Sequence, residues 1–303
     1  MLLRPPLLYL SRSKNLERFI KVNPWARRAA SRFVAGKSRD EALRVSAELN
    51  RLGFKVTLDY LGEEVRRSED ARLAAEEQAA AVEAAASAGL DLGLSVKLSH
   101  LGMLIDEGLA EENLRMICQR SAAAGRFVRV DMEGSALTSG TLEMVQRVHD
   151  DIPVIGTVIQ SALKRSSADI ETLNRKGISV RLVKGAYLEP SDLAFQRREE
   201  VTLYFMRLTE SLLRDGYRPA IATHDDLLID YAIDMAFIYG CAPEEFEFQM
   251  LYGIRRDLQE KLRDQGYRVR IYLPYGSDWY GYFMRRLAER PSNLWFLLRH
   301  LRN

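Results

Sequence analysis

From residue 55 onward, the chain alternates between short runs rich in β-branched and apolar residues and longer stretches with helical periodicity. Eight short runs occur, at residues 55–59, 93–98, 127–131, 154–160, 179–184, 220–224, 246–249 and 268–272. The helical stretches lie at residues 69–88, 111–124, 141–150, 168–176, 198–215, 226–239, 258–265 and 279–288. Such alternation predicts an α/β fold with a parallel sheet, and eight repeats favour a closed (βα)8 barrel over an open sheet.

The composition is that of one large globular core. The 303 residues are 47% hydrophobic and 28% charged with a net charge of +2, which excludes a disordered chain. We expect residues 51–303 to form the barrel and residues 1–50 to form a helical segment packed on it. Cys118 and Cys241 lie in apolar helical contexts without metal-ligand spacing, which is typical of reduced cysteines in a cytoplasmic protein. No apolar run approaches the roughly 20 residues that span a bilayer.

The segment before Lys37 is basic and amphipathic. Its basic residues are Arg4, Arg12, Lys14, Arg18, Lys21, Arg27, Arg28 and Arg32, and its one acid is Glu17. Two interpretations fit this pattern: helices packed on the barrel with a solvated face, or peripheral contact with an anionic membrane surface. Nucleic-acid binding is not predicted, because the chain carries no zinc-finger spacing or RNP-like segment and its overall charge is nearly neutral.

Polar residues stand where the predicted strands end, which is where catalytic groups of barrel enzymes collect. They are Glu63, Lys97, Asp131, Gln160, Lys184, His224, Gln249 and Tyr272. Each one alone is compatible with a structural ion pair or hydrogen bond. Together, cations facing carboxylates predict a small anionic substrate and an anionic cofactor or phosphate. No Gly-x-Gly-x-x-Gly or Walker loop follows a strand, so neither a Rossmann nor a P-loop site is predicted, and no metal site is predicted.

A second cationic group follows the last predicted strand. Tyr282, Arg285, Arg286 and Glu289 are spaced so that they share one side of a helix, and Glu289 can hold the Arg285 guanidinium. A solvated basic face is one interpretation of this pattern. The aromatic residues around the arginine pair favour the other interpretation, in which both guanidinium groups bind one carboxylate.

These patterns leave the chemistry open, because a strand-end lysine such as Lys97 or Lys184 serves equally as an aldolase-type Schiff-base nucleophile or as a hydrogen-bond donor. Further motifs, matching in order from about Glu63 to Arg299, closely resemble the proline dehydrogenase family. The motifs are Leu61-Gly62-Glu63, Lys97-Leu98, Arg129-Val-Asp131-Met-Glu133, Gln160, Arg181-Leu-Val-Lys184-Gly185-Ala186-Tyr187, Ala222-Thr-His224, Phe246-Glu-Phe-Gln249-x-Leu251-x-Gly253 and Tyr282-x-x-Arg285-Arg286-x-x-Glu289.

The resemblance implies a distorted (βα)8 barrel with noncovalent FAD, which oxidises L-proline to Δ1-pyrroline-5-carboxylate by hydride transfer from proline C5 to flavin N5. It also implies a membrane quinone as electron acceptor and a separate pyrroline-5-carboxylate dehydrogenase that takes the product. The length leaves no room for the second enzyme domain of bifunctional relatives, so the chain resembles the monofunctional bacterial form. Hydroxyproline dehydrogenase is the alternative, and Tyr272 argues against it because relatives that prefer hydroxyproline carry a smaller residue there.

Residue roles follow from the same resemblance. The implied catalytic residues are Lys97, Asp131, Arg181 and Tyr272, with Asp131 holding the Tyr272 hydroxyl. The implied substrate-binding residues are Glu63, Lys97, Leu251, Tyr272, Tyr282, Arg285, Arg286 and Glu289. The arginine pair and Lys97 are expected to bind the proline carboxylate, the two glutamates to orient the arginines, and the remaining side chains to wall the ring.

The implied FAD-binding residues are Asp131, Gln160, Arg181, Lys184, Gly185, Ala186, Tyr187, Thr223, His224, Gln249 and Leu251. Arg181 and Gln160 are expected beside the isoalloxazine, and Lys184 and His224 on the ribityl and pyrophosphate side. Asp225 departs from the family pattern, in which asparagine is frequent. No residue is compelled by its position to act as a base for the proline amine, which can lose its proton to water on binding.

Overall fold

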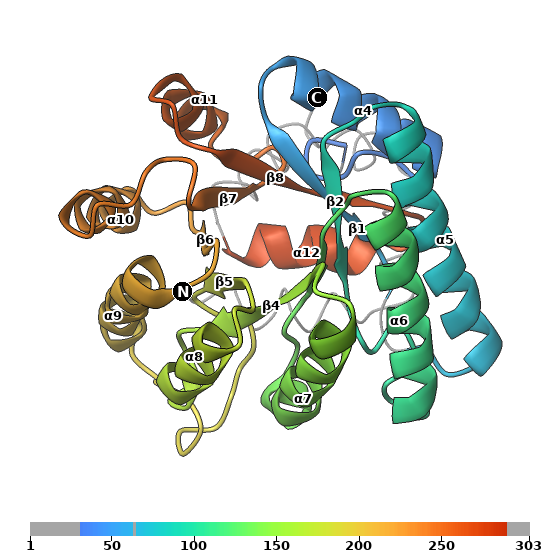
Figure 1. Ribbon diagram of the computed structural model, residues 1–303, viewed down its shortest axis with the longest axis horizontal. Helices are drawn as coiled ribbons and strands as arrows, with labels where there is room; N and C mark the ends of the chain where they lie inside the picture. The colour runs from blue at the N-terminus through green and yellow to red at the C-terminus, as the bar shows by residue number, and fades with distance from the viewer. Residues whose placement is uncertain (1–30, 63–64, 290–303) are drawn as a thin grey trace, which may run out of the picture.

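Eight parallel strands close into a single barrel in sequence order, as the alternation predicts (Figure 1). The structure is a computed structural model that describes residues 31–62 and 65–289, with the backbone alone described for residues 287–289. The strands are β1 (Lys55–Tyr60), β2 (Leu92–Val96), β3 (Val128–Val130), β4 (Ile155–Gln160), β5 (Val180–Val183), β6 (Ala220–Ala222), β7 (Glu247–Leu251) and β8 (Val269–Tyr275). Pairing of β1 with β8 closes the barrel, with Thr57 opposite Tyr272.

One described helix precedes the first strand, and the others follow the strands in alternation. These helices are α4 (Arg39–Arg51), α5 (Ser68–Ser87), α6 (Glu107–Ala123), α7 (Ser135–Asp151), α8 (Ser166–Arg175), α9 (Arg198–Asp215), α10 (Asp226–Ile238), α11 (Arg256–Asp264) and α12 (Trp279–Glu289). None of these helices is long and apolar enough to cross a membrane. The predicted division at residue 50 stays a prediction, because residues 1–30 lie outside the described part of the chain.

The main core lies between the strands and the surrounding helices. Val56, Leu58, Ile271 and Leu273 are fully buried in it, whereas Arg270 and Tyr272 alternate with the last two along β8. Since side chains of a strand alternate between its two faces, one face of β8 packs on the helices and the other carries polar groups into the barrel. Several predicted strand ends are corrected. β7 continues beyond Gln249 and β8 beyond Tyr272, whereas β2 ends at Val96 and β6 at Ala222, so that His224 follows its strand and does not end it.

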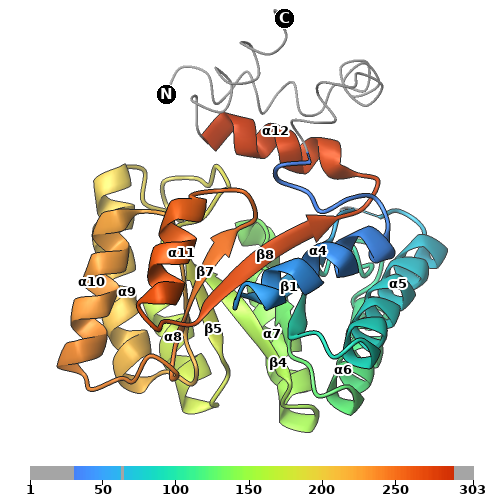
Figure 2. The same cartoon turned by 90° about the horizontal axis from the view of Figure 1, so that it is seen from above.

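The last helix departs from the regular barrel plan, in which each helix lies beside the wall. α12 lies across the end of the barrel toward which β8 points (Figure 2). Its Trp279 and Phe283 pack with Phe33, Leu61 and Ile254 in a second apolar cluster. α4, which precedes the first strand, packs against β1 and β8 instead. The barrel is thus distorted at its closing seam, and α12 covers the strand ends where the candidate site lies.

Candidate active site

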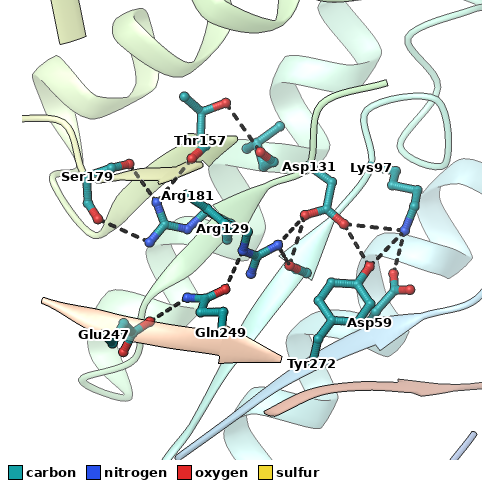
Figure 3. A network of polar contacts seen from close by, with 12 residues as sticks. Asp59, Lys97, Arg129, Asp131, Thr157, Ser179, Arg181, Glu247, Gln249 and Tyr272 are labelled. Carbon is teal, nitrogen blue, oxygen red and sulfur yellow. Dashed lines mark hydrogen bonds and ion pairs between the residues drawn. The ribbon is translucent and has the colours of Figure 1, made fainter. Parts of the chain in front are cut away.

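Five charged or hydroxyl side chains meet inside the barrel, near the end toward which the strands point, and we call them the Lys97 cluster. They are Asp59 of β1, Lys97 after β2, Asp131 after β3, Arg181 of β5 and Tyr272 of β8 (Figure 3). The Lys97 ammonium lies 2.7 Å from Asp59 Oδ1, 3.3 Å from the Tyr272 hydroxyl and 3.5 Å from Asp131 Oδ2. Barrel closure brings these residues together although they span more than 200 positions of sequence.

Asp131 connects Tyr272 with Arg181 in the Lys97 cluster. Its Oδ2 accepts a 2.8 Å hydrogen bond from the Tyr272 hydroxyl, which is the contact expected from the sequence. Its Oδ1 accepts hydrogen bonds from Arg181 Nη1 at 2.7 Å and from Ser95 Oγ at 3.1 Å. The Arg181 guanidinium also lies 5.4 Å from the centroid of the Tyr272 ring. Arg181 and Tyr272 are therefore fixed by the same carboxylate and by each other.

The pKa values of the two carboxyl groups of the cluster are shifted in opposite directions. Burial raises the pKa of Asp59, and although Lys97 opposes this, the negative charge of Asp131 raises the pKa further. Burial also acts to raise the pKa of Asp131, but Lys97 and Arg181 outweigh it and the pKa is lowered. Burial and the two neighbouring carboxylates hold the pKa of Tyr272 well above its usual value. Near neutral pH, Asp131 is therefore an ionised acceptor and Tyr272 a protonated donor.

Arg181 has hydrogen-bonding capacity left over. Its Nε donates to Gln249 Oε1, while its buried Nη2 has no hydrogen-bond partner among the described residues. A buried guanidinium nitrogen without a partner is costly in a native protein, so a bound group that accepts a hydrogen bond there would relieve that cost. This position suits the electron-rich edge of an anionic or carbonyl-bearing cofactor.

The other residues expected on the cofactor side line the ends of β4 to β7. Gln160 Nε2 donates to the Glu133 carbonyl at 2.9 Å, and Leu251 N donates to His224 Nε2 at 2.9 Å. Gly185 adopts φ +105°, and a Cβ there would lie 2.9 Å from Gln160 Oε1, so glycine is required at this turn. Thr223 is buried, whereas Ala186 and Tyr187 are exposed in the loop after β5.

Lys184 lies 2.9 Å from Asp225, the residue that departs from the family pattern. Both side chains are more than a third exposed, so their attraction is screened by solvent. A phosphate group that approaches Lys184 meets an ammonium already shared with a carboxylate. The local charge at this point of the rim is therefore less positive than the lysine alone suggests.

α12 brings the predicted substrate-binding aromatic residue to the same end of the barrel. Tyr282 is buried in the second apolar cluster, and Leu251 and Tyr272 pack against that cluster. The Arg286 guanidinium lies 5.0 Å from the Tyr282 ring centroid, and both Arg285 and Arg286 are half-buried. A fully solvated basic face does not fit this packing. The Glu63 prediction and the Glu289 side-chain prediction lie outside the described residues.

A second, largely buried polar group lies nearer the end of the barrel where the strands begin, and we call it the Glu247 cluster. It comprises Arg129, Ser179, Glu247 and Arg270. Arg270 Nε donates to Glu247 Oε1 at 2.8 Å, and Arg129 donates to the Ser179 carbonyl at 2.6 Å and to the Ser179 hydroxyl at 3.1 Å. Gln249 links the two clusters, because its amide nitrogen donates to Glu247 while its oxygen accepts from Arg181.

The residues that the sequence-based prediction missed are mainly those inside strands. Asp59 is 2% exposed and touches Lys97, yet it was assigned only to the end of a predicted strand. Arg270 and Glu247 were likewise counted as strand residues. A signal was present, because lone charged residues alternating with apolar ones in a buried strand must point into the barrel and find partners there.

Comparison with known proteins identifies the family to which this geometry belongs. Residues 42–299 match the family model described as proline dehydrogenase. The chain belongs to the proline dehydrogenase family. It is 40% identical to "Proline dehydrogenase 1" of Bacillus subtilis subsp. natto, over 98% of this chain and 98% of that protein. It is 38% identical to "Proline dehydrogenase" of Deinococcus radiodurans, over 98% of this chain and 97% of that protein.

Solved structures of proline dehydrogenase relatives share the fold. Proline utilization A from Bdellovibrio bacteriovorus, inactivated by N-propargylglycine, superposes with a TM-score of 0.81 at 26% identity. That match covers 87% of this chain and 33% of the other, so this proline dehydrogenase family member spans about a third of that chain. The expected family and the expected barrel are thus both confirmed.

Proposed function

We propose that this chain is a flavin-dependent proline dehydrogenase that oxidises L-proline to Δ1-pyrroline-5-carboxylate. The observation that carries the proposal is the Lys97 cluster, in which a partly buried lysine and a buried arginine are held by carboxylates, and in which Tyr272 packs against the α12 aromatic cluster. Fixed cations beside an apolar wall suit a small ring that carries a carboxylate. Membership of the proline dehydrogenase family supports the same substrate.

Substrate binding is assigned to the cations and to the aromatic wall. Arg285, Arg286 and Lys97 bind the proline carboxylate, because charge-assisted hydrogen bonds to a carboxylate are among the strongest available to a protein. Tyr272 and Leu251 pack against the α12 aromatic cluster and so form the wall for the proline ring. The Tyr272 hydroxyl donates to Asp131, which fixes the ring plane of this wall. A hydroxyl on the substrate ring would meet this occupied position, which favours proline over hydroxyproline.

FAD is the cofactor that the residues fit best, and when bound it supplies the hydride acceptor. The unpartnered Arg181 Nη2, the Gln160 amide and the Lys184 ammonium are the groups that would hold it. Arg181 places a fixed positive charge where negative charge develops during the reaction, which is the most effective form of electrostatic stabilisation. The proline amine must be unprotonated when hydride leaves C5, and no described residue is assigned as its base.

The remaining assignments follow from the family. A membrane quinone is proposed as electron acceptor and a separate pyrroline-5-carboxylate dehydrogenase as the enzyme that takes the product. Peripheral membrane contact is proposed through the basic segment before Lys37, most of which lies outside the described residues. Salt-sensitive binding of the protein to anionic vesicles, strengthened by proline, tests this contact.

The visible absorption spectrum of the purified protein, recorded anaerobically before and after L-proline is added, tests the proposed reaction. Flavin bands that bleach with L-proline and respond far less to hydroxyproline are the expected result. A protein that stays colourless after incubation with FAD would contradict the proposal. A Schiff-base aldolase that uses Lys97 or Lys184 on this barrel is disfavoured, because residues 42–299 match the proline dehydrogenase family model.

A further inference from the structure

Asp59 is a buried acid at the floor of the site to which no role has been assigned. Its side chain is 2% exposed, whereas that of Lys97 is 12% exposed. The contact between Asp59 Oδ1 and Lys97 Nζ, at 2.7 Å, is shorter than the contacts of this ammonium with Tyr272 and Asp131. Asp59 is thus the nearest and the more deeply buried partner of the Lys97 ammonium.

Two of these contacts determine how the ammonium is oriented. The Tyr272 hydroxyl donates its own proton to Asp131, so its oxygen accepts from Lys97 at 3.3 Å. One N–H of Lys97 is directed to Asp59 and another to Tyr272. Because the N–H bonds of an ammonium have tetrahedral geometry, fixing two directions fixes the orientation of the whole group. A freely rotating lysine would otherwise lose side-chain entropy each time a carboxylate bound to it.

The buried position of Asp59 is costly, which points to a role other than stability. Burial raises the pKa of Asp59, and the negative charge of Asp131 adds to that effect. A buried carboxylate paired with a lysine is often no more stable than an apolar pair of similar volume. Lys97 is shared by Asp59 and Asp131, and Asp131 is also paired with Arg181 at 2.7 Å. Asp131 thus has a second cation, whereas Asp59 pairs with Lys97 alone among the described residues.

We propose that Asp59 is a positioning residue that orients the Lys97 ammonium toward the carboxylate of the bound substrate without touching the substrate itself. The inference rests on the proposed function, because it takes a ring carboxylate as the ligand of Lys97. It adds a residue to the site that the strand-end pattern does not contain. Asp59 also interacts with the Tyr272 hydroxyl, but the proposal makes Lys97 the group through which Asp59 acts on ligand affinity.

The test is a double-mutant cycle that measures ligand binding. The dissociation constant of tetrahydrofuran-2-carboxylate, a proline analogue with no amine to oxidise, is measured for wild type, Asp59→Asn, Lys97→Met and the double variant, together with KM and kcat for L-proline. We expect Asp59→Asn to weaken analogue binding about 10-fold or more and to raise KM more than it lowers kcat. In the Lys97→Met background the same change should alter binding less than about 2-fold, since coupling requires both partners.

The signs of these effects separate positioning from simple charge. Removing a negative charge near an anion-binding site would tighten binding if Asp59 acted only through space. Tighter or unchanged analogue binding in Asp59→Asn would overturn the proposal, and so would an equal loss in the Lys97→Met background. The matched control is Asp91→Asn, which removes the carboxylate that pairs with Lys55 at 2.5 Å at the start of the strand that carries Asp59, far from the Lys97 cluster, and should change analogue binding less than about 2-fold.

If Asp59→Asn does not fold, Asp59→Glu is measured in its place. Asp59→Glu keeps the charge and moves the carboxylate by one methylene, so it should weaken binding by about 5-fold or more, and unchanged binding would overturn the proposal. Wild-type enzyme is included in each series. If L-proline fails to bleach the wild-type flavin, the proposed function fails, whereas normal bleaching with unaltered Asp59 variants removes only the positioning role.

Discussion

The Lys97 cluster and the Glu247 cluster use the same kinds of residue inside one barrel, yet they are built differently. In the Glu247 cluster, Arg270 pairs with one glutamate and also donates to the Val56 carbonyl at 2.9 Å. In the Lys97 cluster, two carboxylates surround a lysine and an arginine, and Arg181 Nη2 has no partner among the described residues. Arg129 Nε of the Glu247 cluster also has no partner among the described residues, so an unpartnered nitrogen does not by itself separate the clusters. The difference is that Tyr272 of the Lys97 cluster packs against the α12 aromatic cluster, where a ligand would be walled, whereas Arg270 is tied to the Val56 carbonyl of the barrel wall.

The pKa shifts of the ionisable groups also differ between the two clusters. Burial acts to raise the pKa of Glu247, but the Arg270 guanidinium outweighs it and lowers the pKa to about 2. Burial and the positive charge of Arg181 lower the pKa of Arg129 to about 9, so it remains charged near neutral pH. The acids of the Lys97 cluster instead shift in opposite directions. Divergent shifts between neighbouring acids are typical of functional sites.

The largest expected effect is that of Arg181→Met. The change leaves the Asp131 carboxylate without its arginine and removes the proposed charge beside the cofactor. We expect the rate of flavin reduction by L-proline to fall by about 1000-fold, equivalent to about 4 kcal/mol. Stopped-flow absorbance measures this rate. A variant that retains FAD and is reduced at the wild-type rate would place Arg181 outside the reaction.

Arg270→Met is the matched change in the Glu247 cluster. It leaves Glu247 buried without its cation, so we expect the free energy of unfolding to fall by about 3 to 4 kcal/mol. Urea titration followed by circular dichroism measures this loss. At temperatures where the variant stays folded, kcat/KM should fall by less than about 10-fold, because Arg270 reaches Arg181 only through Glu247 and Gln249. A kinetic defect as large as that of Arg181→Met would break the distinction between the clusters.

Acid stability sharpens the comparison. The folded-state pKa of Glu247 is depressed from 4.5 to about 2, so its stabilising effect is present above pH 4.5 and is lost as pH falls toward 2. The effect amounts to about 3 kcal/mol. Glu247→Gln should therefore lose stability at neutral pH and show a flatter stability profile between these pH values. A profile parallel to that of wild type would contradict the lowered pKa.

The smallest expected effect is that of Tyr272→Phe, which removes one hydroxyl from the Lys97 cluster. Asp131 and Lys97 each lose one hydrogen-bond partner, while the ring that walls the substrate stays in place. We expect kcat/KM for L-proline to fall roughly 10-fold, which is equivalent to a loss of about 1 to 2 kcal/mol of transition-state stabilisation. The free energy of unfolding should change little. Steady-state kinetics measure this change. A loss as great as that of Arg181→Met would mean that the hydroxyl reacts with substrate directly.

Much of the site was predictable because barrel enzymes gather their functional groups at strand ends. Lys97, Asp131, Gln160 and Lys184 could be picked out for that reason, and each does end or directly follow its strand. Gln249 and Tyr272 were also found, but for an incomplete reason, because both lie inside longer strands. Asp59 was missed although the predicted strand ended there, because Glu63, which follows the strand, was taken as its functional residue.

The sequence by itself determined the eight-fold alternation, and with it the closed parallel barrel and the family. Periodicity is a local property of a chain, so it can be read without knowing which segments meet. Tertiary structure decided that Asp59 pairs with Lys97, that Asp131 joins Arg181 to Tyr272, and that α12 covers the strand ends while α4 packs at the closing seam. These contacts join strands far apart in sequence, and the residues' partners depend on how barrel closure sets the register between strands.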